Sequence, residues 1–267
     1  MAFLLAGEPR VHASTITRTV LTMAPSPASI NLFDGLDQSR TIHYKSLQAF
    51  NAAIQLLKTN INNGRARNQY LIVRDINKET MKHIDDRGYK GVRYEWHGDL
   101  ETLIVKVPTK AHETAAGEFG SEIITAASAM GLPRIQRRIV GAATFQAAAG
   151  TPRKEGDWSM MPRNLRTKPG DFPTIVVEVG FSETLRKLRS DARLWFSMSN
   201  NDVQIVILIS VARNEIIFEK WTVEPIPVGQ LPCATQSITV TRTQPNNTLA
   251  ITDGTAPLLE FNKLFLR

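Results

Sequence analysis

The spacing of apolar residues predicts three long helices. In the first, over residues 46–61, apolar side chains recur every three or four positions, and Gly64 follows the end of the run. The second covers residues 111–130 and is followed by Gly131, a residue typical of helix C-termini. The third spans about residues 182–197. A shorter helix is expected over residues 78–87.

Strand-like runs occupy much of the remaining chain. One strand is expected at 103–107, before the second long helix. Beyond that helix the order is three strands, a helix and two strands. These strands are predicted at 139–145, 156–161, 174–179, 203–211 and 215–221. The tail, 236–264, suggests a hairpin that turns at Pro245-Asn246-Asn247.

Together these elements predict an α/β protein. Residues 1–100 are expected to form a lead-in and an N-terminal elaboration packed on the core, of which residues 1–40 show little periodicity. Residues 101–267 form the core with its C-terminal hairpin. A chain of 267 residues fits one large domain.

Composition narrows the class of protein. The apolar fraction of 42% and the charged fraction of 21% are those of a globular protein. Cys233 is the only cysteine, so no internal disulfide forms. The first apolar run is too short for an export signal, and no run approaches the length of a membrane span. We therefore expect an intracellular protein of the nucleus or cytoplasm, not bound to a membrane. Whether it forms a homodimer stays open.

Positive charge is concentrated in one part of the chain. Residues 134–193 hold twelve basic and six acidic side chains, and twelve minus six gives +6 of the total +7. Such a surface is typical of proteins that bind the phosphate backbone of nucleic acids. A solvated basic face without a polyanion partner explains the count equally well.

Two carboxylates carry the candidate chemistry. Asp157 begins an expected strand, and Glu178 lies late in the apolar run of the next one. Burying a lone carboxylate is costly, so Glu178 must be paired, protonated or bound to an ion. Neighbouring antiparallel strands would bring the two acids close together, where they could bind Mg²⁺ or Mn²⁺. The alternative is that Asp157 caps a turn and Glu178 forms a structural ion pair with a helix arginine.

Several segments resemble the PD-(D/E)XK nuclease-like superfamily. Within it, the chain is similar to the Uma-type restriction endonuclease-like proteins and to related fungal proteins. The segments that carry this resemblance are Ala111-His112-Glu113-Thr114-Ala115, Lys154-Glu155-Gly156-Asp157, residues 172–183, residues 190–195 and residues 203–209. The resemblance implies a restriction-endonuclease-like mixed sheet flanked by helices.

The resemblance also implies roles for the two acids. Asp157 and Glu178 match the metal-binding acids of the family, and Glu113 matches a third acid beside the metal. The lysine expected two residues after the second acid is absent, because Gly180 stands there. Lys187 and Arg193, on the following helix, are the candidates to replace it. Glu113 is better explained as a glutamate in the first turn of a helix, and Lys187 can also be explained as an ion-pair partner of Glu183.

Two functions follow from these observations. The first is a metal-dependent phosphodiesterase that acts on nucleic acid through Asp157 and Glu178. Its expected substrate-binding residues are Lys154, Arg163, Arg186 and Arg189, with Arg193 beside them. The second is a catalytically inactive nuclease fold that binds nucleic acid or a protein partner, and the absence of the lysine favours it. An enzyme that has adapted the fold to a small molecule remains a third hypothesis.

Overall fold

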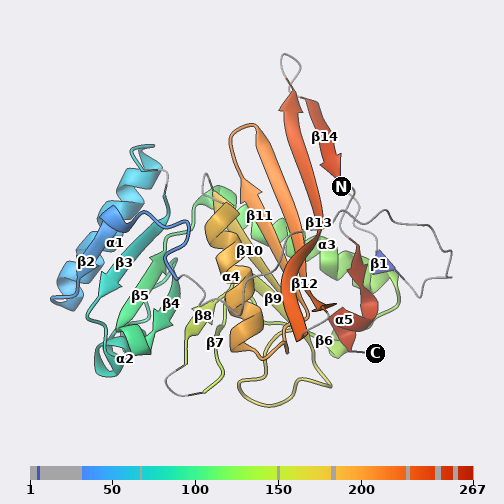
Figure 1. Cartoon of the computed structure of the whole chain (residues 1–267), viewed down its shortest axis with the longest axis horizontal. Helices are drawn as coiled ribbons and strands as arrows, with labels where there is room; N and C mark the ends of the chain where they lie inside the picture. The colour runs from blue at the N-terminus through green and yellow to red at the C-terminus, as the bar shows by residue number, and fades with distance from the viewer. Residues whose placement is uncertain are drawn as a thin grey trace.

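The computed structural model describes residues 5–6, 32–66, 68–148, 151–181, 185–226, 229–243, 248–254 and 258–266. Within these residues the protein is a mixed α/β structure, with two large mixed sheets side by side and helices packed on them (Figure 1). No helix among these residues is long and apolar enough to cross a bilayer.

The N-terminal part forms a six-stranded sheet. Its strand order is β2-β3-β5-β4-β8-β7, in which only β2 and β3 pair in parallel. The strands are β2 (Thr41–His43), β3 (Tyr70–Arg74), β4 (Arg93–His97), β5 (Thr102–Lys106), β7 (Thr144–Gln146) and β8 (Arg153–Glu155). Helices α1 (Leu47–Asn62) and α2 (Lys78–Arg87) bury their apolar residues against one face of this sheet.

The C-terminal part forms a seven-stranded sheet in the order β14-β13-β12-β11-β10-β9-β6. Its strands are β6 (Arg137–Ile139), β9 (Trp158–Pro162), β10 (Ile175–Phe181), β11 (Ile205–Val211), β12 (Glu215–Ile226), β13 (Gly229–Thr243) and β14 (Thr248–Gly254). β10 and β11 run in parallel, and the other pairs are antiparallel.

Two helices cover opposite faces of the seven-stranded sheet (Figure 1). α3 (Lys110–Ala129) packs against the odd-numbered apolar residues of β10, and α4 (Leu185–Met198) against the even-numbered ones. This follows from the two-residue period of a strand. Glu178 shares its face with Val176, so its side chain points to the α4 side.

Small elements complete the fold. Three 3-10 turns, η1 (Gln38–Arg40), η2 (Gly98–Leu100) and η3 (Arg134–Gln136), each lie beside a strand. β1 (Leu5–Ala6) pairs in parallel with β15 (Leu259–Glu260), which leads into α5 (Phe261–Phe265).

The predicted helix ends agree with the structure. The Ser46, Asn77 and Thr109 side chains accept hydrogen bonds from backbone N–H groups in the first turns of α1, α2 and α3. Gly131, just after α3, has a φ of 80°, a left-handed conformation that glycine adopts without strain. The expected start of the third long helix, residues 182–184, lies outside the described residues.

One strand prediction was wrong. Residues 139–145 do not form a single strand, because β6 ends at Ile139 in one sheet and β7 begins at Thr144 in the other. Between them Gly141 has a φ of 63°, and the backbone N–H groups of Val140 and Gly141 both donate to the Ser159 carbonyl. This turn sends the chain from one sheet to the other.

The N-terminal sheet is larger than the sequence pattern indicated. β3 and β4 were not predicted, and the expected boundary at residue 100 falls between the paired strands β4 and β5. The hairpin expected over 236–264 is formed by β13 and β14, but β13 begins earlier, at Gly229. Its predicted turn, residues 245–247, lies outside the described residues.

Candidate functional site

A cluster of seven buried charged side chains lies between the two sheets. The six-stranded sheet supplies Glu95, Lys106 and Lys154, and the other half supplies Asp157, Glu178, Lys187 and Asp191. The chain crosses from β8 to β9 at Gly156-Asp157, so Asp157 stands where the two sheets meet. Each of the seven residues is between 1% and 6% exposed. Charges buried this deeply require partners.

Asp157 is held by groups from three different elements. Its Oδ2 accepts hydrogen bonds from Lys106 Nζ and from the Val179 backbone N–H, both at 2.7 Å, and lies 2.9 Å from His112 Nε2. Burial by itself would raise the pKa of Asp157, but Lys106 and His112 outweigh it and hold that pKa far below its usual value. Asp157 is therefore ionised throughout the physiological range.

Glu178 lies beside Asp157, as the sequence predicted. Its Oε2 is 3.6 Å from Lys106 Nζ, the same ammonium that binds Asp157. Its Oε1 accepts a hydrogen bond of 2.7 Å from the Trp195 indole and lies 3.5 Å from Lys154 Nζ. Burial raises the pKa of Glu178 to about 7, with repulsion from Asp157 adding to the effect and Lys154 opposing it.

The remaining members form a second group of ion pairs. Lys154 Nζ lies 2.7 Å from Glu95 and 3.0 Å from Asp191. Lys187 Nζ lies 3.1 Å from Glu95 and 2.7 Å from Asp191. His97 Nε2 contacts the other Glu95 oxygen at 3.0 Å. Lys187 thus pairs with Asp191 one turn later on α4, whereas its predicted partner Glu183 lies outside the described residues.

Two glycines near the acids, Gly180 and Gly156, are closely packed by other side chains. A Cβ on Gly180 would lie 3.1 Å from the Leu188 side chain, so the position where the family carries a lysine is packed against an apolar residue. A Cβ on Gly156 would lie 3.0 Å from Val176 and 3.3 Å from Trp195. The ammonium groups of this site therefore come from other elements.

Some of the predicted site residues lie apart from this cluster. Glu113 is half exposed and binds Arg93 at 2.9 Å, and Arg93 Nε is in turn 3.8 Å from Asp157. Arg193 lies on the exposed side of α4 with its guanidinium 5.1 Å from the centre of the Trp221 ring. Neither residue forms a hydrogen bond or an ion pair with Glu178, and Arg193 belongs to the surface cations of α4.

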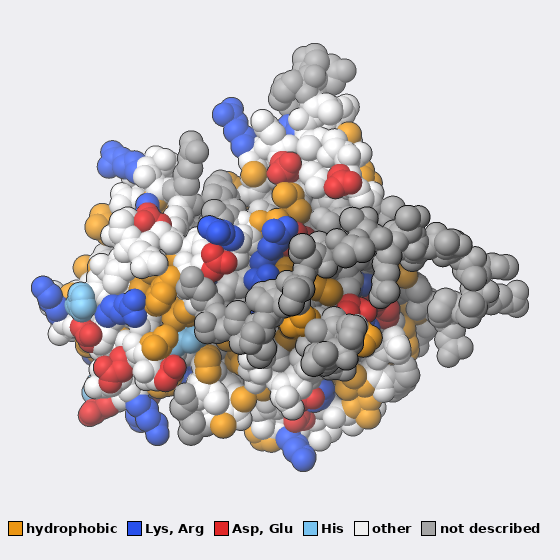
Figure 2. Space-filling model, viewed as in Figure 1, with side chains coloured by type: hydrophobic (Ala, Val, Ile, Leu, Met, Phe, Trp, Pro, Cys, Tyr) orange, Lys and Arg blue, Asp and Glu red, His pale blue; other side chains and the backbone are white. Residues whose placement is uncertain are grey.

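The surface cations of α4 have acidic partners. Arg186 pairs with Asp34 at 3.3 Å, and Arg189 binds Glu219 through two of its nitrogens. Figure 2 shows Lys and Arg side chains over the upper part of α4 and, across the same face, cations interspersed with Asp and Glu. Of the expected substrate-binding residues, Arg163 alone is exposed without a side-chain partner among the described residues.

The sequence did not point to Lys106, Glu95 and Asp191. Lys106 ends the apolar strand β5, and Glu95 lies within β4 between two aromatic residues. A charged residue inside a buried strand was the available signal. His112, in the first turn of α3, would ordinarily be expected to be solvated, but its side chain is buried against Asp157.

The arrangement does not fit a divalent cation as it stands. Lys106 Nζ contacts both Asp157 and Glu178, so an ammonium lies where an ion shared by these acids would bind. No group of three or more potential His, Cys, Asp or Glu ligands occurs among the described residues. The Mg²⁺ or Mn²⁺ cofactor stays a prediction.

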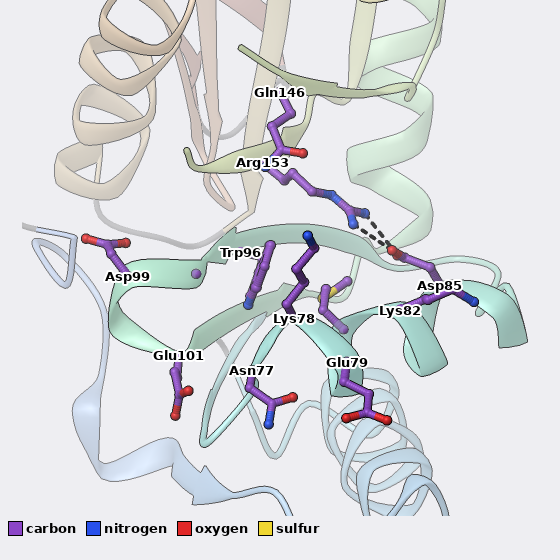
Figure 3. A pocket seen from close by; sticks show the side chains of 12 residues that line it. Asn77, Lys78, Glu79, Lys82, Asp85, Trp96, Asp99, Glu101, Gln146 and Arg153 are labelled. Atoms are coloured by element: carbon purple, nitrogen blue, oxygen red, sulfur yellow. Dashed lines mark hydrogen bonds and ion pairs between the residues drawn. The ribbon is translucent and has the colours of Figure 1, made fainter. Parts of the chain in front are cut away.

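A separate cavity of about 950 Å³ opens on the six-stranded sheet. Figure 3 shows it between the start of α2 and Trp96, with Arg153 reaching across to Asp85. Its charged lining carries both signs, and neither Asp157 nor Glu178 belongs to it.

Comparisons with known proteins add no relative: no protein-family model matches the chain, and no curated protein matches it at a significant level.

Proposed function

We propose that this chain is a nucleic-acid-binding protein with a nuclease-like fold, which binds the phosphate backbone and does not cleave it in the closed arrangement of Asp157 and Glu178. The observation that carries this proposal is a set of basic side chains that have no bonded partner among the described residues. Phosphate binding needs such cations, whereas cations in internal ion pairs contribute little to it.

The twelve basic residues of 134–193 divide into two groups. Eight are engaged with other protein groups: Arg137, Arg153, Lys154, Arg166, Arg186, Lys187, Arg189 and Arg193. Twelve minus eight leaves four whose side chains make no hydrogen bond or ion pair with a described residue: Arg134, Arg138, Arg163 and Lys168. The positive charge of this region is therefore available at these four positions.

Three of the four free cations are held on neighbouring segments at one edge of the seven-stranded sheet. β6 is the edge strand and carries Arg138, and η3, which carries Arg134, runs directly into it. The backbone N–H of Arg163 donates to the carbonyl of Gln136, the last residue of η3, at 2.9 Å. Arg134 and Arg163 are exposed, and Arg138 is half-buried. We call these three residues the β6-edge arginines.

The order of elements supports the relation to nuclease-like proteins. α3 is followed by the antiparallel strands β6, β9 and β10, then by α4 and by β11, which is parallel to β10. The resemblance implies a mixed sheet of this kind, flanked by helices, with one acid at the start of a strand and the second on the next strand. Asp157 and Glu178 occupy such places beside β9 and in β10.

A metal-dependent phosphodiesterase is the second candidate function. The observation that favours it is the closeness of Asp157 and Glu178, which share one ammonium at 2.7 and 3.6 Å. Cleavage through these acids would require Lys106 to leave its place. The adaptation to a small-molecule substrate finds no support in the lining of the cluster, which protein charges fill.

Binding to duplex DNA and RNA as a function of salt tests the proposal. In Arg134→Ala/Arg138→Ala/Arg163→Ala we expect weaker binding and a slope of log affinity against log salt that is smaller by about 2.7, which is three contacts at about 0.9 each. The matched control replaces Lys82, Arg186 and Lys263, three surface cations that have acidic partners, by alanine.

Both triple variants have a net charge of +4, because 7 minus 3 is 4. Equal losses in the two would show that net charge, and not the β6 edge, drives binding, and would contradict the proposal. Cleavage by the wild type in Mg²⁺ or Mn²⁺ that Asp157→Ala abolishes would establish the phosphodiesterase instead.

A further inference from the structure

Lys106 reaches from one sheet into the acidic site of the other. It is the last residue of β5, where it is in register with Tyr70 on β3 and Arg93 on β4. Its neighbour Val105 packs into the core beneath α1 and α2. The two-residue period of the strand therefore turns Lys106 away from that core and towards Asp157 and Glu178.

The Lys106 ammonium lies between the two acids. Nζ is 2.7 Å from Asp157 Oδ2 and 3.6 Å from Glu178 Oε2. It also lies 5.9 Å from the centre of the Tyr70 ring, with the Lys187 ammonium 5.8 Å from the same centre. Lys106 is 5% exposed, so its ammonium is shielded from solvent.

The charges around Lys106 are nearly balanced without a metal. The cluster has four carboxylates, Glu95, Asp157, Glu178 and Asp191, and three ammonium groups, Lys106, Lys154 and Lys187. The Arg93 guanidinium lies 3.8 Å from Asp157 and is shared with Glu113, which it binds at 2.9 Å. A divalent cation added to the three ammonium groups would set five positive charges against the four buried carboxylates, which is costly.

We infer that Lys106 is an internal counter-ion that takes the position between Asp157 and Glu178 at which a divalent cation would bind, and that the six-stranded sheet thereby closes this site to metal. Two carboxylates that converge on one point are a suitable site for Mg²⁺ or Mn²⁺ when nothing occupies it. Removal of the Lys106 side chain would leave Asp157 and Glu178 without the ammonium that they share, and would leave room for an ion between them.

Binding of Mn²⁺ alone tests this inference, measured as the loss of free Mn²⁺ signal in electron paramagnetic resonance. We expect Lys106→Ala to bind one Mn²⁺ at least about tenfold more tightly than the wild type. Lys106→Ala/Glu178→Gln should lose this binding. The matched control is Lys106→Met, which removes the charge but fills the space with an apolar chain, and it should not gain the site.

Thermal melting keeps the test decisive if Lys106→Ala does not fold in plain buffer. Mn²⁺ or ethylammonium, a small cation that replaces the lost ammonium, should raise the melting temperature of Lys106→Ala and not that of Lys106→Met. A Lys106→Ala protein that neither cation stabilises and that gains no Mn²⁺ binding would overturn the inference. Wild-type binding of Mn²⁺ that depends on Glu178 would overturn it as well. Neither measurement involves nucleic acid, so the β6-edge proposal stands or fails separately.

Discussion

The protein uses its cations in opposite ways in two regions. In the cluster between the sheets, Lys106, Lys154 and Lys187 are buried and each contacts at least two carboxylates. At the β6 edge, Arg134 and Arg163 are exposed and have no acidic partner among the described residues. The first group holds two sheets together, and the second is available to an outside partner.

The comparison shows that a net charge counted from the sequence does not by itself describe a basic surface. Residues 134–193 have an excess of six positive charges, which by itself suggests one continuous basic surface. The structure divides the same residues between a buried network and an exposed edge. Charge that is already paired inside the protein does not attract a polyanion, because its field is cancelled at short range.

The largest expected effect comes from removing a carboxylate of the cluster. Asp157→Ala leaves Lys106 buried with one acid fewer and removes the bond to the Val179 backbone. We expect a loss of about 3–5 kcal/mol in the free energy of unfolding, measured with urea. Asp202→Ala, which breaks an exposed pair with Arg166, is the control and should cost under about 1 kcal/mol. Similar losses in both variants would contradict the comparison.

A pH-dependent effect of intermediate size should come from Glu178. Burial raises its pKa to about 7 from 4.5, so between these values the folded state holds a proton that the unfolded state has lost. Wild-type stability should therefore fall as pH rises through this window, by up to about 3 kcal/mol. The low pKa of Asp157 adds no slope there, because this acid is ionised in both states.

Glu178→Gln removes this dependence. Urea unfolding of the wild type and the variant at about pH 4.5, 6 and 7.5 should show the wild type losing stability relative to the variant as pH rises. Glu113→Gln, which changes an exposed carboxyl outside the cluster, is the control. A constant difference between wild type and Glu178→Gln would show that folding does not raise the pKa of Glu178.

The smallest effect on stability is expected at the β6 edge. Arg138→Ala removes a side chain that pairs with no acid in the described ranges, so the free energy of unfolding should change by less than about 0.5 kcal/mol. Urea unfolding checks this. A loss above about 1 kcal/mol would mean that the Arg138 side chain stabilises the fold and is not available to bind a partner.

Much of the fold near the site could be predicted because its signals are local. The apolar alternation of β10 indicates a buried strand, and the spacing in 111–130 and 182–197 indicates the helices that cover it. Asp157 and Glu178 were expected to lie close because they belong to strands that follow each other in the chain. β9 and β10 indeed pair in antiparallel fashion.

The six-stranded sheet was harder to predict. Its strands come from residues 41 to 155. β7 and β8 follow α3 and β6 in the chain, although β6 belongs to the other sheet. β4 carries charged and aromatic residues in alternation, Arg93 to His97, which does not resemble an apolar strand pattern. Its burial becomes clear only when the second half of the molecule covers its polar face.

The sequence by itself determined the helices, the central strands and the two acids on neighbouring strands, because each is encoded in a few consecutive residues. Only the tertiary structure decided which cations surround those acids. Lys106 is 51 residues from Asp157, and Lys187 is 92 residues from Glu95. Such partners have no local signature, since they meet only when two sheets pack together. Packing therefore decided that these charges neutralise one another, and that Arg134, Arg138 and Arg163 have no acidic partner within the described part of the chain.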